Sequence, residues 1–135
     1  FELTRRLRSR VLAARTVLSS PEDVHAAFGS LMEGLKREVF RVALLDAQNG
    51  LLRDVIVSEG TVSATLVHPR EVFKPAILES AASVILVHNH PTPSHADIQM
   101  TQTIIDIARP LGIAVHDHIV VGKEGHASFK SLRLI

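Results

Sequence analysis

The sequence predicts an α/β sandwich with a mixed β-sheet. Two observations carry this prediction. Apolar, β-branched runs bounded by turn signals alternate with amphipathic helical segments along the chain, and one short run, Ala81 to Val87, is apolar on both faces. A strand that is apolar on both faces is typical of the centre of a sheet that helices cover on both sides. A hairpin would supply antiparallel pairs and a helix between strands a crossover, which makes the sheet mixed.

Two helices are expected at the start of the chain. Apolar residues at helical spacing predict an amphipathic helix over 3–18. Ser20 and Pro21, followed by an acid, predict a capped second helix that runs to about Met32. We therefore divide the chain into an N-terminal helix at 1–19 and a domain at 20–135. Because the sequence begins with Phe1, we expect it to be part of a longer protein.

Three strands should follow. The runs 39–45 and 51–57 flank Asn49-Gly50, which is a strong signal for a two-residue hairpin turn, so they are expected to pair antiparallel. The run 61–67 follows a glycine and is expected to extend the same sheet.

The second half of the chain alternates helices and strands. Pro69 opens a helix to about residue 79, and Ser94 caps a helix over 94–108 that a Pro-Leu-Gly sequence ends. Two closing strands are expected at 114–121 and 127–135.

The composition of the sequence argues against several classes of function. The 135 residues carry a net charge of +1, which gives no overall field for binding a polyanion. Without cysteine, a metal must be bound by histidine and carboxylate side chains. The apolar runs are far shorter than the roughly 20 residues of a membrane helix. No signal peptide is recognisable, so we expect a cytoplasmic protein without a membrane partner.

Potential metal ligands follow the buried strand. His88 and His90 are two residues apart, so their side chains point to the same side of a strand, where they can share one ion. Asp97, in the first turn of the next helix, could add a carboxylate and leave a fourth position open for water. The simpler interpretation is a pair of hydrogen-bonded histidines and a capping box formed by Ser94 and Asp97. Asp97 can both take part in a capping box and bind a metal ion, so the two interpretations are compatible.

These residues carry a family resemblance. Val87-His88-Asn89-His90-Pro91, followed by Ser94-x-x-Asp97, resembles the core motif of the JAMM (MPN+) metalloproteases. The surrounding sequence, over about residues 20 to 135, resembles the RadC family of bacterial proteins. The matching stretches are Arg37-Glu38-Val39-Phe40, Leu45-Asp46, Gly60-Thr61, His68-Pro69-Arg70-Glu71-Val72 and Asp117-His118-Ile119-Val120-Val121-Gly122.

The resemblance implies a cytidine deaminase-like (JAB/MPN) fold and a role for each site residue. It implies that His88, His90 and Asp97 hold Zn²⁺, that Glu38 is the general base and that Ser94 stabilises the oxyanion. Spacing alone does not favour Glu38 over Glu71 or Glu79, since each lies near the end of an element. A helix-hairpin-helix segment usually precedes the domain in this family.

One departure from the family is visible between the histidines and the helix. The family has a longer loop there, whereas this chain passes from Pro91 through Thr92 and Pro93 to Ser94. We interpret this as a missing surface loop. A true deletion would leave a stiff connection that keeps Asp97 away from the histidines.

A second His-x-His pattern, His116-Asp117-His118, is interpreted as structural, with His118 the better candidate for lining the site. The favoured function is a zinc-dependent hydrolase that cleaves a peptide, isopeptide or other amide bond in an unknown peptide or protein substrate. One alternative is a nucleic-acid-associated or DNA-repair-associated module, supported by Arg5, Arg6, Arg8, Arg10 and Arg15. Another is an inactive MPN-like scaffold. Apolar strand edges such as 55–57 would allow a dimer.

Overall fold

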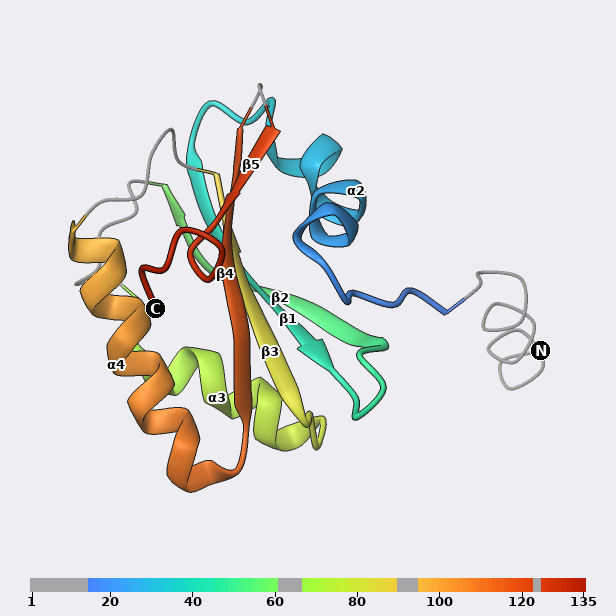
Figure 1. The fold of residues 1–135 in the computed structure, drawn as a ribbon, viewed down its shortest axis with the longest axis vertical. Helices are drawn as coiled ribbons and strands as arrows, with labels where there is room; N and C mark the ends of the chain where they lie inside the picture. Colours follow the sequence, from blue (N-terminus) through green and yellow to red (C-terminus); the bar gives the residue numbers. More distant parts are fainter. Residues whose placement is uncertain (1–14, 61–66, 90–94, 123–124) are drawn as a thin grey trace.

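The computed structural model describes residues 15–60, 67–89, 95–122 and 125–135. They form one five-stranded sheet with strand order β2-β1-β3-β4-β5, flanked by helices (Figure 1). In chain order the elements are α2 (Pro21–Met32), β1 (Glu38–Leu45), β2 (Leu51–Gly60), α3 (Pro69–Leu78), β3 (Ser83–His88), α4 (His95–Leu111), β4 (Ala114–Gly122) and β5 (Gly125–Ser128).

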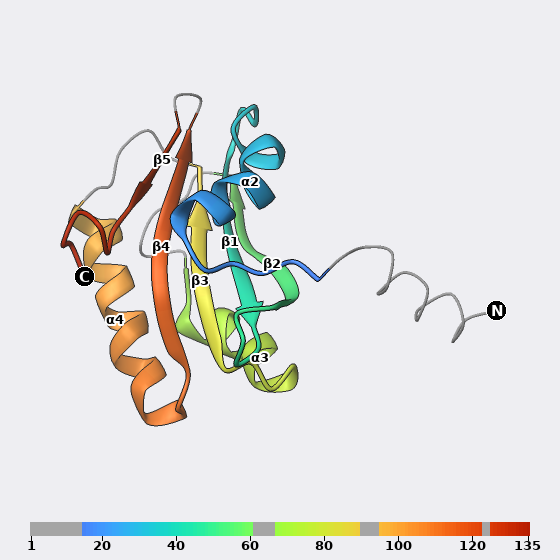
Figure 2. The same ribbon diagram turned by 45° about the vertical axis from the view of Figure 1, so that its right-hand side comes forward.

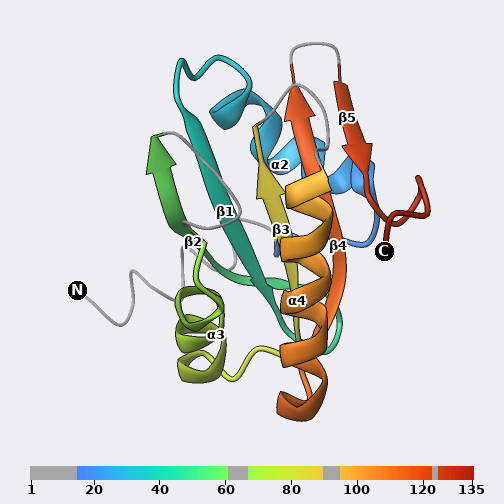
Figure 3. The ribbon, with the colours of Figure 1, turned by 90° about the vertical axis from the view of Figure 1, so that its left-hand side faces the viewer.

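The sheet is mixed, as predicted. β1 pairs antiparallel with both β2 and β3, whereas β3 and β4 pair in parallel through the crossover helix α4. The predicted crossover at 69–79 is also present, because α3 connects β2 to β3 across the intervening β1. Figure 3 shows α3 and α4 on one face of the sheet, and Figure 2 shows α2 on the other. The molecule is therefore an α/β/α sandwich.

The two faces of β1 build two separate apolar cores. Alternate side chains of a strand point to opposite faces, so this central strand contributes to both. Phe40 and the other β1 residues on its face of the sheet pack with α3 and α4. Val39 and the β1 residues on the opposite face pack with α2. The first core includes Phe40, Val42, Leu44, Val72, Phe73, Ala76, Leu86, Met100 and Ile104; the second includes Leu18, Val24, Phe28, Met32, Val39, Ala43, Leu45, Ile85 and Val87.

Local signals set the ends of the helices. The Ser20 hydroxyl accepts a hydrogen bond from Asp23 N at 3.2 Å, which confirms the predicted cap of α2. α4 continues beyond the predicted end at Ala108 to Leu111. Gly112 then adopts φ +71°, and Ile113 N donates to Ala108 O at 3.2 Å. This is a Schellman C-cap, which glycine adopts at little steric cost.

The prediction of a helix over 3–18 is wrong for the residues that the structure describes. Val17 forms an isolated antiparallel bridge with Gly50, and Leu18 N donates to Asn49 O. Leu18 is fully buried in the α2-side core, so extended pairing along the hairpin replaces the helix. The remainder of that segment, residues 1–14, lies outside the described residues.

The hairpin forms at the predicted place with a longer turn. β1 and β2 pair antiparallel from Leu45↔Leu51 onward, so five residues connect the strands instead of two. The Asp46 carboxylate accepts hydrogen bonds from Gln48 N and Gly50 N, each at 2.9 Å, and closes this longer loop. β2 continues to Gly60, past the predicted end at 57; the predicted strand at 61–67 falls almost entirely outside the described residues.

The last predicted strand is much shorter than expected. β5 ends at Ser128, and residues 129–133 form turns. The buried Asp117 carboxylate accepts hydrogen bonds from the Ser128 hydroxyl and from Lys130 N, so the chain folds back around this side chain. Such side-chain acceptors compete with a strand ladder for backbone donors, and alternation in sequence does not reveal them.

None of the helices in the described part of the chain combines the length and apolar character needed to cross a membrane.

Candidate functional site

Polar side chains gather inside the sandwich, between the sheet and α4. His88 is the last residue of β3, His118 lies in the neighbouring β4, and Thr101 and Asp97 lie one turn apart on α4. All four are buried, and the two histidines are 0% exposed. Buried polar side chains need partners, so their contacts define the chemistry of this region.

The two histidines and the threonine form a continuous hydrogen-bonded chain. His88 Nδ1 lies 2.7 Å from His118 Nε2. His118 Nδ1 lies 2.6 Å from Thr101 Oγ1, and this hydroxyl donates to the backbone carbonyl of Asp97 at 2.7 Å. His118 is the residue predicted to line the site, and in the structure its ring is in direct contact with His88.

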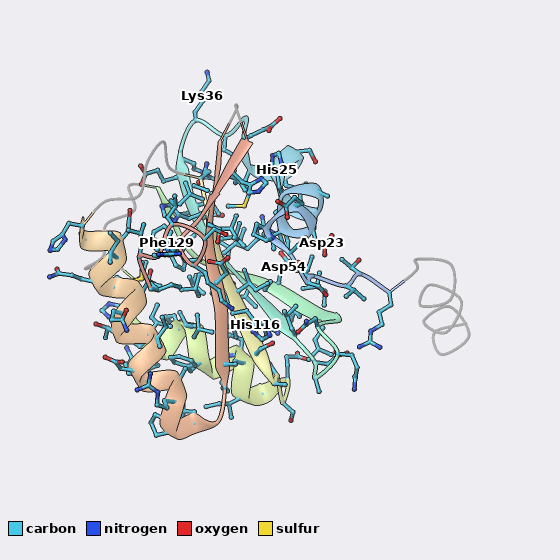
Figure 4. All side chains as sticks on the ribbon, viewed as in Figure 1. Asp23, His25, Lys36, Asp54, His116 and Phe129 are labelled. Carbon is cyan, nitrogen blue, oxygen red and sulfur yellow. The ribbon has the colours of Figure 1, made fainter. Side chains whose placement is uncertain are left out.

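Aromatic rings enclose this chain. Phe40 of β1 stacks on His88 with ring centroids 5.6 Å apart, and Phe129 stacks on His118 at 4.1 Å. Figure 4 shows Phe129 between α4 and the sheet. Burial, together with the neighbouring His88, lowers the pKa of His118 well below its ordinary value of 6.5, so His118 is neutral at pH 7.

The Asp97 carboxylate lies beside the His88 ring, at one end of this hydrogen-bonded chain. Its Oδ2 lies 3.9 Å from His88 Nε2, and its side chain is 7% exposed. A tetrahedral zinc ion with bonds of about 2.0–2.1 Å holds two ligand atoms about 3.3 Å apart. A small movement would bring these two atoms into that range, so His88 and Asp97 fit a shared metal ion.

The structure describes only part of the predicted site. His90 and Ser94 lie outside the described residues. Within those residues, no three histidine or acidic side chains are arranged to hold a metal ion. The two predicted ligands that are described, His88 and Asp97, are brought together despite the short connection between β3 and α4.

Glu38 lies at the same end of the sheet. It is the first residue of β1, and Phe40, on the same strand face, is paired with His88 across the β1–β3 ladder. Glu38 is half-buried and borders a surface depression with Lys36 and Gly60. The other two acids weighed from the sequence, Glu71 and Glu79, lie at the first turn and the C-cap of α3. Glu79 pairs with Arg53 at 3.5 Å.

Asn89 was not assigned a role from the sequence, yet it fixes the backbone on both sides of Glu38. Its Oδ1 accepts a hydrogen bond from Val39 N at 2.6 Å, and its Nδ2 donates to Arg37 O at 3.0 Å. The same amide nitrogen lies 3.2 Å from Met32 O. The side chain next to His88 therefore ties the Glu38 segment to the end of β3. Its position between two histidines in the sequence was the only available signal.

Thr101 was also missed from the sequence. Its signal was a polar residue four positions after Asp97 on the apolar face of a predicted amphipathic helix. Spacing shows that Thr101 lies beneath Asp97, but it does not show that β4 supplies a histidine there.

His116 is separated from His118 despite the His-x-His pattern. The β3–β4 register shifts between Val84 and Ile85, which interrupts the regular alternation of side chains. His116 borders a cavity with Leu18 and residues at the start of α2, and its Nε2 lies 3.1 Å from Asn49 Oδ1. The structural interpretation of the second motif is consistent with this geometry.

Of the five arginines behind the nucleic-acid alternative, only Arg15 is described. It forms an ion pair with Asp46, so its charge is balanced locally. The other four lie outside the described residues.

The described residues form a mixed five-stranded sheet flanked by three helices, with buried histidines where β3 and β4 meet α4, an architecture consistent with a JAB-type (MPN) domain. Comparison with known families agrees: residues 18–134 match the RadC-like JAB domain. The chain belongs to the RadC family.

Curated relatives support this assignment. The chain is 44% identical over 134 residues to a UPF0758 protein of Methanosarcina acetivorans and 43% identical over 134 residues to one of Methanosarcina mazei. It is 44% identical over 132 residues to a UPF0758 protein of Syntrophotalea carbinolica. These matches cover 95–96% of this chain and 58% of each relative, so the chain spans somewhat more than half the length of these proteins.

Proposed function

We propose that this domain is a zinc-dependent hydrolase of the JAMM type that cleaves an amide bond in a peptide or protein, including isopeptide bonds. The observation that carries the proposal is the approach of Asp97 Oδ2 to His88 Nε2 at the end of the buried strand. Imidazole and carboxylate groups are ligand types that zinc prefers, and here one of each meets inside the protein.

His88, Asp97 and His90 would hold the ion. When bound, zinc would lower the pKa of a water molecule and polarise the substrate carbonyl. Glu38 would accept a proton on its carboxylate from the attacking water and return it to the leaving amide nitrogen. The Ser94 hydroxyl would donate a hydrogen bond to the carbonyl oxygen as negative charge develops there.

The contacts of Asn89 support the assignment of the general base to Glu38. A general base acts only when it is held within hydrogen-bond reach of the proton that it removes. Asn89 holds the two residues that flank Glu38 and is itself next to His88, so hydrogen bonds tie the Glu38 segment to the end of the ligand strand. Within the described part of the chain, the Asn89 side chain makes no hydrogen bond to Glu71 or Glu79, which lie at the first turn and the C-cap of α3.

The proposal is tested by zinc content and by hydrolysis of a panel of fluorogenic peptide and lysine-linked isopeptide substrates. Glu38→Gln should retain zinc and lose about 10²- to 10⁴-fold in rate, the usual contribution of a general base. His88→Ala should lose both zinc and activity. Glu33→Gln, at an exposed acid just after α2, is the matched control and should match the parent protein. Full zinc in His88→Ala, or equal rates for the parent and Glu38→Gln, would contradict the proposal.

A further inference from the structure

The hydrogen bonds among Thr101, His118 and His88 determine which ring nitrogen of each histidine carries a proton. A backbone carbonyl can only accept, so the Thr101 hydroxyl gives its single hydrogen to Asp97 O. The Thr101 oxygen must therefore accept from His118, which places the proton of His118 on Nδ1. The His118 ring is fully buried and enclosed by His88, Thr101 and the ring of Phe129, surroundings that disfavour a charge, so it carries only this one ring proton.

The same reasoning extends to His88. With its proton on Nδ1, His118 presents the lone pair of Nε2 to His88. His88 Nδ1 lies 2.7 Å from that lone pair, so His88 must be the donor and carry its proton on Nδ1. Its Nε2 then bears the lone pair, and this is the nitrogen that faces Asp97 Oδ2.

We propose that Thr101 and His118 are positioning residues that act as a tautomer relay, a chain of two hydrogen bonds that keeps the proton of His88 on Nδ1 and a lone pair on Nε2, the nitrogen that a metal ion would bind. The consequence for metal binding rests on the proposed function; the proton order itself does not.

The surroundings make the relay rigid. His118 and Thr101 are fully buried, and Phe40 and Phe129 pack against the histidine rings. The buried Asp117 carboxylate also accepts a hydrogen bond from His118 N at 2.7 Å, which fixes the backbone that carries the ring. A second partner on the far nitrogen of a metal-binding histidine sets its tautomer and orientation, and loss of such a partner costs about 10- to 100-fold in metal affinity.

Thr101→Val tests the relay with almost no change in shape. Valine cannot accept from His118 Nδ1, so a proton there would be buried without an acceptor. The alternative tautomer, with the proton on Nε2, would instead donate to His88 Nδ1. That bond would move the His88 proton to Nε2, the nitrogen that a metal needs.

The experiment measures histidine tautomers by ¹⁵N-resolved NMR of the full chain without added metal, and then zinc affinity by competition with a chelator at one fixed pH. The parent protein should show His88 and His118 protonated at Nδ1. Thr101→Val should show both protonated at Nε2 and bind zinc about 10- to 100-fold more weakly. Thr101→Ser keeps a hydroxyl and should restore both properties.

Thr103 provides a matched control in the same helix. Its hydroxyl donates to Gln99 O at 3.0 Å, the same type of backbone contact that Thr101 makes, but its side chain is exposed and has no hydrogen bond to His88 or His118. Thr103→Val should therefore leave the tautomers and the zinc affinity unchanged.

The outcomes separate the two proposals. A parent spectrum with His88 protonated at Nε2 would overturn the relay without any variant. Unchanged tautomers in Thr101→Val would overturn it as well. Full zinc in His88→Ala would contradict the proposed function, yet the tautomer result would still decide the relay. If His88→Ala loses zinc while Thr101→Val binds it as the parent does, the relay is wrong and the zinc site stands.

Discussion

The side chain of Asn89 and the backbone of Val39 are joined by a 2.6 Å hydrogen bond between segments 50 residues apart in sequence. The same side chain donates to Arg37 O, so both peptide groups that flank Glu38 are held from the end of β3. The loop between α2 and β1 is thereby tied to the end of β3. These hydrogen bonds hold Glu38, the proposed base, near His88, the proposed ligand.

Asn89→Ala should destabilise the fold and loosen this connection. The variant loses three hydrogen bonds, and at roughly 0.5–1.5 kcal/mol each we expect a loss of about 3 kcal/mol in the free energy of unfolding. Urea denaturation measures this loss, and hydrogen exchange should show reduced protection of the Val39 amide. Gln102→Ala, which removes an exposed amide from α4, is the control. Unchanged protection of Val39 would show that Asn89 does not hold the loop.

Two buried serines should respond in opposite directions to the same substitution. Within the described residues the Ser83 hydroxyl has no hydrogen-bond partner, so Ser83→Ala removes a buried polar group and should be neutral or stabilising by up to about 1 kcal/mol. The Ser128 hydroxyl donates to Asp117 and accepts from Ser131 N, so Ser128→Ala should cost about 1–2 kcal/mol. Equal losses in thermal or urea unfolding would contradict this contrast.

The hairpin turn should contribute a pH-dependent part of the stability. The hydrogen bond from Gly50 N, with smaller effects of Gln48 N and Arg15, holds the pKa of Asp46 below its ordinary value of 3.8 against the opposing effect of desolvation. A carboxyl whose pKa is lower in the folded state stabilises the fold above the unfolded-state pKa. This contribution is lost as the pH falls through the folded-state pKa.

Thermal unfolding of the parent and Asp46→Asn checks this expectation. The difference in Tm should be constant from pH 7 to about 5 and shrink below about pH 4, where the unfolded carboxyl begins to bind its proton. Arg15→Gln should keep most of this pH dependence, because the backbone hydrogen bond is the larger cause. A Tm difference that is independent of pH would contradict the role of Asp46.

Much of the fold could be predicted because its elements carry local signals. The buried strand at 83–88 was visible as an apolar run, and α2 as a serine cap followed by proline. The errors arose where distant partners compete with local pattern. Val17 and Leu18 have helical spacing, but the hairpin offers them a strand partner, and Asp117 turns the chain after Ser128.

The site was predictable only in part for the same reason. Residue type and spacing suggested His88 and Asp97, which the structure brings within 3.9 Å. The sequence also indicated His118 as a candidate for lining the site. Its contacts with His88 and Thr101 depend on the pairing of β3 with β4 and on the packing of α4, and the contacts of Asn89 depend on the pairing of β1 with β3; residue spacing reveals none of these. The choice of Glu38 over other acids required the family resemblance, and its connection to Asn89 now supports that choice.

The most direct test of the central claim is the zinc content per chain, measured by mass spectrometry of metals on protein purified without chelator, for the parent and for Asp97→Ala. Asp106→Ala, at an exposed acid of the same helix, is the control. The zinc hydrolase account predicts about one zinc per chain in the parent and the control and a nearly complete loss in Asp97→Ala. Zinc retained in Asp97→Ala, or a parent protein that stays free of zinc after loading, would contradict it.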